Sequence, residues 1–155
     1  MNTFEKSMHV MNELFAKDCT FALATSTNNI PSVRFIDTYF YNGAFYVVTY
    51  ALSKKVQEIT VNNQVSLCNK LYRFNGRAYN IGHPLVEENK ELREKLVKAF
   101  EPWYFNHNDE NDENMCIVKI DLENGFFYQD GTGYTVNFVQ KEAEQFPFDF
   151  DITPI

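Results

Sequence analysis

The feature that most constrains this fold is a change in the spacing of apolar residues near residue 19. Between residues 3 and 17 the apolar side chains recur every three or four positions, which predicts an amphipathic helix that begins near Thr3. After that point, runs rich in β-branched and aromatic residues predict strands. These runs cover residues 19–27, 33–41 and 44–51. A chain that changes period in this way is expected to pack helices against a sheet.

The segments between these runs predict turns and a second, shorter helix. Asn28–Pro31 separates the first two strands, and Asn42-Gly43 suits a type I′ hairpin turn because both residues tolerate positive φ. Ser53 is a suitable N-cap for a helix that ends near Val61. Further strands are expected over residues 65–74, 76–82, 115–122 and 125–131, with turns or bulges at Gly76 and Gly82.

The C-terminal half adds one more helix and two polar segments. Pro84 precedes an amphipathic pattern that predicts a helix over Leu85–Phe100. Residues 106–114 are polar and acidic, so we expect an exposed loop without a calcium site. An acidic tail covers about residues 142–155. The order of elements predicts a single α+β domain over residues 1–155, with an antiparallel barrel and helices outside it.

Charge and composition exclude several classes of partner. The net charge is −7, which disfavours binding to nucleic acid. No apolar run approaches the roughly 20 residues that span a bilayer, and we expect a cytoplasmic protein without a membrane partner. Three cysteines and three histidines are widely spaced, so neither disulfides nor a metal site is expected.

The distribution of charge is more informative than its sum. Residues 30–77 carry six basic and two acidic side chains, a net +4, whereas the rest of the chain carries −11. A basic segment in an acidic protein suits a site for a small anion. A scatter of solvated lysines and arginines explains the same numbers equally well.

One constellation within this segment can bind a phosphate group. Arg34 and Thr49 are expected on neighbouring strands, and Ser53 with Lys54 and Lys55 opens the short helix. A phosphate there would meet a guanidinium, ammonium groups, hydroxyls and free N–H groups of a helix N-terminus. The alternative is that Ser-Lys-Lys is a solvated helix start and that Arg34 pairs with an acidic neighbour such as Asp37.

These residues also carry a family resemblance. The motifs are Pro31-Ser-Val-Arg34, Val47-Val-Thr49, Ser53-Lys-Lys55 and Asn62-Asn-Gln-Val-Ser-Leu67. Their order and spacing resemble the pyridoxamine 5′-phosphate oxidase-like family, whose fold is an FMN-binding split barrel. The resemblance covers most of residues 1–135. It implies an antiparallel split β-barrel with flanking helices and FMN as the cofactor.

The resemblance also implies which residues bind FMN. Arg34 and Lys55 would bind its phosphate, with Ser53 and Lys54 completing the site. The backbone of Phe35 and Ile36 would contact the edge of the flavin ring, and Val48, Thr49 and Tyr50 would lie along the ring or the ribityl chain. The family pattern implies a homodimer in which the second subunit completes each site, with Asn69–Arg77 and the region of Trp103 as candidate contributors.

The chain departs from the true oxidase at the substrate side. Tyr39 stands where the oxidase has a lysine, no arginine follows Arg93, and the last histidine is His107. Oxidation of pyridoxine phosphate is therefore not expected. Residues that could line a substrate space, or equally pack in a core, are Tyr39, Trp103, Tyr104 and Tyr128.

The expected function is an FMN-dependent oxidoreductase acting on an unidentified small molecule, with no catalytic residue assigned because the flavin performs the redox chemistry. The alternative is a non-catalytic flavin-binding or haem-binding carrier of the same fold. A third possibility is a structural dimer whose flavin site has decayed.

Overall fold

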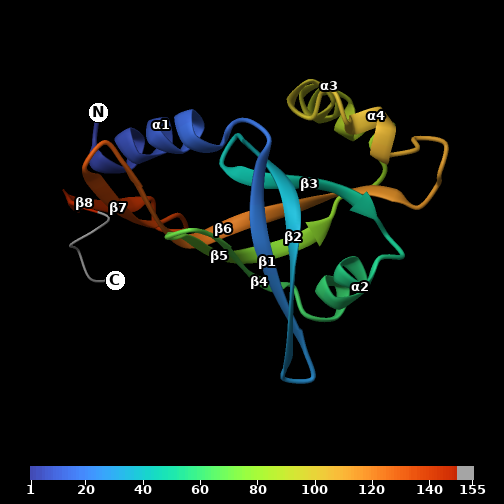
Figure 1. Cartoon of the computed structure of the whole chain (residues 1–155), viewed down its shortest axis with the longest axis horizontal. Coiled ribbons are helices and arrows are strands. Elements are labelled where there is room, and N and C mark those ends of the chain that lie inside the picture. Colours follow the sequence, from blue (N-terminus) through green and yellow to red (C-terminus); the bar gives the residue numbers. More distant parts are fainter. Residues whose placement is uncertain (150–155) are drawn as a thin grey trace.

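Figure 1 shows the computed structural model of the chain, which describes residues 1–149. The helices are α1 (Thr3–Phe15), α2 (Lys54–Val61), α3 (Lys90–Ala99) and α4 (Tyr104–His107), with a 3₁₀ turn, η1, at Glu87–Asn89. The strands are β1 (Cys19–Thr27), β2 (Ile30–Tyr41), β3 (Ala44–Tyr50), β4 (Gln64–Asn69), β5 (Tyr72–Asn80), β6 (Met115–Gln129), β7 (Thr132–Asn137) and β8 (Glu142–Pro147). None of the helices within residues 1–149 is long and apolar enough to cross a membrane.

The strands form one antiparallel sheet that closes into a barrel. Their order is β3-β2-β1-β4-β5-β6-β7-β8, and a further pairing between β3 and β6 joins the first six strands into a ring. β6 is long enough to pair with β3 and β5 at one end and with β7 at the other, so β7 and β8 extend beyond the barrel (Figure 1). The predicted antiparallel barrel with outer helices is confirmed, and the fold is an α+β split barrel.

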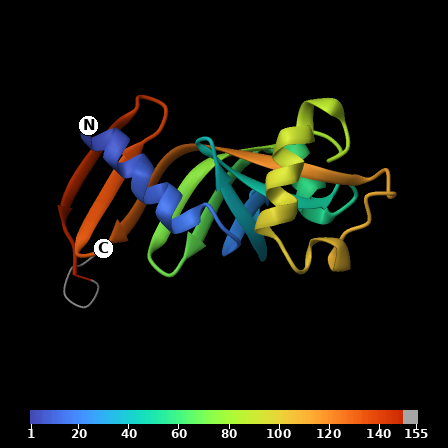
Figure 2. The same cartoon turned by 90° about the horizontal axis from the view of Figure 1, so that it is seen from above.

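Two hydrophobic clusters lie on opposite sides of the barrel wall. The inner cluster is aromatic, because Phe15 at the end of α1 packs against Phe21, Phe45 and Phe74 with ring centroids 5.5–5.7 Å apart. The outer cluster forms where α3 lies over β3 and β6, at the opposite end of the molecule from α1 (Figure 2). Many of the aromatic residues therefore serve packing, each ring pair adding about 0.5–1.5 kcal/mol beyond its buried area.

The two short turns follow directly from their sequences. Asn28 and Asn29 both have positive φ (52° and 62°), as do Asn42 and Gly43 (49° and 86°). Two successive residues of positive φ make the tight turn that matches the twist of a hairpin. The predicted turn at Asn42-Gly43 is confirmed, and β2 begins at Ile30, three residues earlier than predicted.

Several predicted strand boundaries after residue 64 are wrong. The expected strand over residues 65–74 is a hairpin of β4 and β5 that turns at Lys70, which adopts a φ of 53°. The expected strands over 115–122 and 125–131 are the single strand β6. Gly125 lies within this strand, and a Cβ there would overlap the ring of Phe74, so the glycine meets a packing requirement and does not mark a turn.

Glycines and helix ends account for most of the remaining differences. The bulge at Gly76 is confirmed by a register shift against β6, and Gly82 turns with a φ of 101°. The helix predicted over Leu85–Phe100 is shorter, since α3 begins at Lys90 after η1. Part of the acidic tail is strand β8, which pairs with β7, and residues 150–155 lie outside the described part of the chain.

Candidate functional site

The barrel wall opens between β2 and β3. These strands pair only over Tyr39–Tyr41 and Ala44–Tyr46. Beyond that short ladder β2 continues along β1, whereas β3 continues along β6. The two strands therefore diverge, and α2 follows β3 at this opening (Figure 1).

Arg34 lies on β2 at the opening and is held along one side. Its Nη1 donates hydrogen bonds to the carbonyl oxygen of Leu23 (3.2 Å) and to the hydroxyl of Thr25 (2.8 Å). Its Nη2 lies 3.5 Å from Oε1 of Glu58. Within residues 1–149, Nε and Nη2 make no hydrogen bond, so one edge of the guanidinium retains its donors. That edge is the fork that binds two oxygens of a phosphate or carboxylate.

Lys55 reaches the same opening from α2. It lines a very small cavity, of about 10 Å³, together with Thr49, Leu23 and apolar side chains. Burial lowers the pKa of Lys55 below its usual value, and the positive charge of Arg34 lowers it further. Thr49 and Lys55 therefore line one cavity, and Arg34 is near enough to Lys55 to affect its pKa, although Arg34 and Thr49 lie where their strands no longer pair.

The start of α2 supplies the remaining polar groups of the site. Ser53 is the N-cap, and its hydroxyl accepts a long hydrogen bond (3.5 Å) from the backbone N–H of Val56. The N–H groups of Lys54 and Lys55 lie in the first turn, where no carbonyl of the helix can reach them. Lys54 is 82% exposed, and its Nζ is 4.0 Å from Glu58. We call Arg34, Ser53, Lys54 and Lys55 the anion cradle.

Glu58 is a member of this site that the sequence did not single out. It is 6% exposed, and its Oε2 accepts a hydrogen bond of 2.6 Å from the hydroxyl of Thr25. That bond, followed by the charge of Arg34, holds the pKa of Glu58 below its usual value. Its Oε1 has no hydrogen-bond partner within the described residues.

Arg34 does not pair with Asp37, the acidic neighbour named in the alternative interpretation of the sequence. Asp37 lies three residues further along β2, and side chains alternate between the two faces of a strand. Asp37 accordingly points to the other face, where it accepts a hydrogen bond from Thr20. Arg34 pairs instead with Glu58, and no local spacing in the sequence predicts that pair; the i,i+4 spacing applies only to the separate contact of Lys54 with Glu58.

The residues expected along a flavin ring do not converge through their side chains. Phe35 is 79% exposed, and Ile36 is buried in the inner cluster. Val48 and Tyr50 face the outer cluster. Thr49 is buried beside the cavity.

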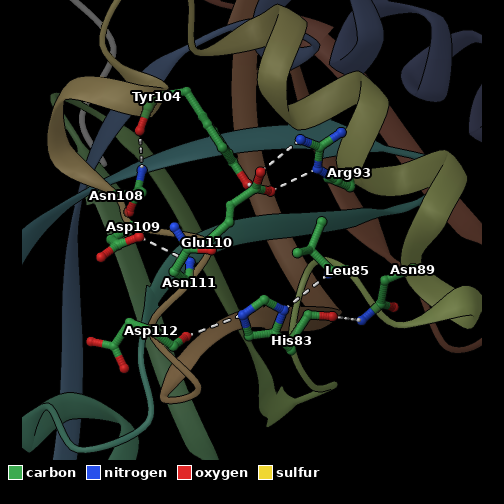
Figure 3. A network of polar contacts seen from close by, with 10 residues as sticks. All are labelled: His83, Leu85, Asn89, Arg93, Tyr104, Asn108, Asp109, Glu110, Asn111 and Asp112. Atoms are coloured by element: carbon green, nitrogen blue, oxygen red, sulfur yellow. Dashed lines mark hydrogen bonds and ion pairs between the residues drawn. The ribbon is translucent and has the colours of Figure 1, made fainter.

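The acidic loop was expected to be exposed throughout, which is wrong for Glu110. Tyr104–His107 forms the short helix α4, and after it Glu110 accepts hydrogen bonds from Nε and Nη2 of Arg93, each 2.6 Å long, and from the hydroxyl of Tyr104 at 3.1 Å (Figure 3). These contacts hold the pKa of Glu110 below its usual value, with the bond from Arg93 the largest cause. The loop is thereby fixed to α3.

A histidine contributes to the same network. The backbone N–H of Leu85 donates to Nδ1 of His83, and Nε2 of His83 is 3.1 Å from the carbonyl oxygen of Asp112 (Figure 3). Because Nδ1 accepts, the proton of the neutral ring is on Nε2, which donates to Asp112. Within residues 1–149, no group of three or more His, Cys, Asp or Glu side chains is placed to hold a metal ion.

The aromatic residues considered for a substrate space are mostly engaged elsewhere. Tyr104 is 1% exposed and bonded to Glu110. Trp103 stacks on Phe100 and donates from Nε1 to Asp18 at 2.7 Å. Tyr128 stacks on Tyr72, and Tyr39 stacks on Tyr41.

Comparison with solved structures places this architecture among known proteins. A NimC/NimA family protein from Clostridium acetobutylicum is 21% identical, with 96% of this chain and 95% of that chain covered and a TM-score of 0.56. An FAD-binding protein from Mesorhizobium loti is 14% identical over 81% of this chain and 92% of that chain, with a TM-score of 0.57. A heme storage protein from Vibrio cholerae is 13% identical over 77% of this chain and 90% of that chain, with a TM-score of 0.59. At these identities the likeness shows the fold alone.

Sequence comparison is more specific. A search of curated proteins gave no match. The sequence profile described as pyridoxamine 5′-phosphate oxidase matches residues 8–129, which include both strands of the opening, the anion cradle and the acidic loop. With the split barrel and its ring of six strands, this match shows that the chain belongs to the pyridoxamine 5′-phosphate oxidase family.

Proposed function

We propose that this chain binds FMN, with the flavin phosphate in the anion cradle, and acts as an oxidoreductase on a small molecule. The observation that carries the proposal is the position of Arg34 and Lys55. The charge of Arg34 lowers the pKa of Lys55, and Nε and Nη2 of Arg34 make no hydrogen bond within the described residues, although Nη2 lies 3.5 Å from Glu58. An anion that bridges Arg34 and Lys55 would relieve the repulsion between them.

The donors present fit a terminal phosphate. Arg34 offers a two-pronged contact, Lys55 and Lys54 offer ammonium groups, and the first turn of α2 offers backbone N–H groups. Ser53 adds a hydroxyl whose present hydrogen bond is long. When bound, FMN would supply the redox chemistry, and this chain would supply binding and orientation.

The proposed ring position follows from the cradle. The backbone of Phe35 and Ile36 continues along β2 from Arg34 and would contact the ring edge. Val48, Thr49 and Tyr50 precede the cradle on β3 and would lie along the ring or ribityl chain. The substrate is not pyridoxine phosphate, because Tyr39 replaces the expected lysine and no arginine follows Arg93.

A second copy of the chain would complete the site. The hairpin of β1 and β2 exposes Ile30, Val33 and Phe35, each more than 60% accessible. Arg73, Phe74 and Asn75 of the Asn69–Arg77 segment line a groove that also contains Phe126. Exposed apolar side chains on the strand of Arg34 favour a homodimer with two sites. All three cysteines are free, which suits a cytoplasmic location.

The first test is a titration of the purified protein with FMN and with riboflavin. The difference between the two affinities isolates the contribution of the phosphate. Arg34→Ala and Lys55→Ala should each weaken FMN by about 1–3 kcal/mol and leave riboflavin unchanged. Lys17→Ala, at an exposed lysine outside the cradle, is the matched control. If Arg34→Ala and Lys55→Ala both bind FMN as tightly as the wild type and the Lys17→Ala control, Arg34 and Lys55 do not bind the flavin phosphate.

The second candidate function is a non-catalytic carrier of flavin or haem. The neighbours of this fold include an FAD-binding protein and a heme storage protein, so the fold itself accommodates carriers. Bleaching of the bound flavin by NAD(P)H, followed by reoxidation with a defined acceptor, distinguishes the enzyme. A flavin complex that no donor reduces at a useful rate favours the carrier.

A further inference from the structure

The buried carboxylate of Glu58 is a feature that anion binding alone leaves unexplained. Its Oε1 lies 3.5 Å from Nη2 of Arg34 and 4.0 Å from Nζ of Lys54, two of the groups that would meet a phosphate. A carboxylate here repels any anion in the cradle, and it does so more strongly than in bulk water because Glu58 is 6% exposed.

Glu58 does not hold Arg34 in place by hydrogen bonding. The guanidinium is positioned through Nη1 by Leu23 and Thr25, at 3.2 Å and 2.8 Å. The contact with Glu58 is longer, and Oε1 accepts no hydrogen bond within the described residues. Glu58 therefore acts on Arg34 directly only through its charge, and indirectly through the hydroxyl of Thr25, which donates to Glu58 and accepts from Arg34.

That charge is present at neutral pH. The hydroxyl of Thr25 donates to Oε2 at 2.6 Å, which stabilises the ionised carboxylate. The pKa of Glu58 is accordingly lowered from its usual value. With three cationic side chains, Arg34, Lys54 and Lys55, and one carboxylate, the cradle carries a net charge of +2.

We propose that Glu58 is a specificity-determining residue, which limits the charge of the cradle to that of a phosphate monoester dianion and so disfavours diphosphates and triphosphates. Without this carboxylate the cradle would carry +3, and its attraction would rise more steeply with the charge of the ligand. Polyphosphate anions would then compete with the monoester. The inference deepens the proposed function and rests on it, because FMN ends in a phosphate monoester.

The test measures how anion affinity depends on anion charge. Inorganic phosphate, pyrophosphate and tripolyphosphate, which carry about two, three and four negative charges near pH 7.5, are titrated into flavin-free protein by calorimetry at low ionic strength. Glu58→Gln should raise each affinity by about threefold for every unit of anion charge. The gain is therefore largest for tripolyphosphate, and FMN affinity rises while riboflavin affinity does not change.

Two further variants separate charge at the cradle from net charge and from folding. Glu13→Gln removes an equal charge from an exposed position on α1, across the molecule from α2, and should leave all three affinities unchanged (Figure 1). Lys54→Met changes a side chain that is 82% exposed and so preserves the fold. Lys54→Met should lower the affinity for each anion by about threefold per unit of anion charge. This variant therefore tests how affinity depends on the charge of the cradle even if Glu58→Gln does not fold.

The outcomes distinguish this inference from the proposed function. Unchanged or weaker polyphosphate binding in Glu58→Gln, or no anion binding by the wild-type cradle, overturns the role of Glu58. Charge-dependent anion binding that responds to both cradle variants supports it, even if the wild-type protein binds no flavin. That last result would refute the proposed function alone.

Discussion

Two of the arginine–glutamate pairs in the described residues have opposite geometries. In the pair on α3 and the acidic loop, Nε and Nη2 of Arg93 each contact an oxygen of Glu110 at 2.6 Å. In the pair on β2 and α2, the same edge of Arg34 is free of hydrogen bonds, and Nη2 lies 3.5 Å from Glu58. We call the Arg93–Glu110 pair closed, because both carboxylate oxygens accept hydrogen bonds from the guanidinium, and the Arg34–Glu58 pair open, because neither does.

The difference shows how one pair of residue types can fix the structure in one place and leave hydrogen-bond donors free in another. A closed fork satisfies the charges and donors of both partners, so it can fix a loop but has nothing left to bind a ligand. The open pair keeps two donors of Arg34 available because Thr25 and Leu23 occupy its other side. Free donors beside a second cation are what a phosphate site requires.

The largest expected effect is at the closed pair. Glu110→Gln should lower the free energy of unfolding by about 2–3 kcal/mol, because it removes one partner of a largely buried ion pair. Thermal or denaturant unfolding measures this loss. FMN affinity should stay unchanged, since the pair is structural.

The same variant has a pH signature. The pKa of Glu110 is lowered in the folded protein, so its stabilising contribution is present above the usual value of 4.5 and is lost as pH falls through the lower folded pKa. The stability difference between wild type and Glu110→Gln should therefore shrink below pH 4.5. A constant difference down to the acid transition would show that the pair is not the cause.

A smaller effect is expected at the open pair when its support is removed. Thr25→Val keeps the shape of the side chain but removes the hydroxyl that orients Arg34. FMN affinity should fall by about 1–2 kcal/mol, with riboflavin affinity unchanged. Thr38→Val, at a buried threonine bonded to the carbonyl of Cys19, is the matched control and should leave both affinities unchanged. Equal losses for both flavins would place the effect in folding instead of in the cradle.

The smallest expected effect is a pH dependence of FMN binding. Burial and Arg34 lower the pKa of Lys55, so its ammonium is lost at a pH below the usual 10.5. FMN affinity relative to riboflavin should decrease by a few-fold as pH rises through this lowered pKa. In the ligand-free protein the folded state disfavours the charged ammonium of Lys55. Deprotonation of Lys55 at rising pH therefore removes a destabilising contribution to folding. Lys55→Arg, which stays charged, should remove the alkaline decrease, and its persistence in that variant would exclude Lys55 as the titrating group.

Local patterns predicted the elements whose structure depends on nearby residues. The first strand has the predicted bounds, and Ser53 caps α2 as expected. The hairpin at Lys70 was missed because a lysine seldom adopts positive φ, so no turn signal was visible. The two parts of β6 were separated because Gly125 resembles a turn residue, whereas its role is to admit the ring of Phe74.

The sequence by itself determined the α+β class, the short turns and the cluster of basic residues around Arg34 and Lys55, because spacing, turn chemistry and composition act over a few residues. Only the tertiary structure decided which acid faces which arginine. Glu58 and Glu110 reach their partners across 24 and 17 positions of chain respectively. Such pairings depend on how β2 and β3 diverge and on where the acidic loop docks, and no local pattern encodes either.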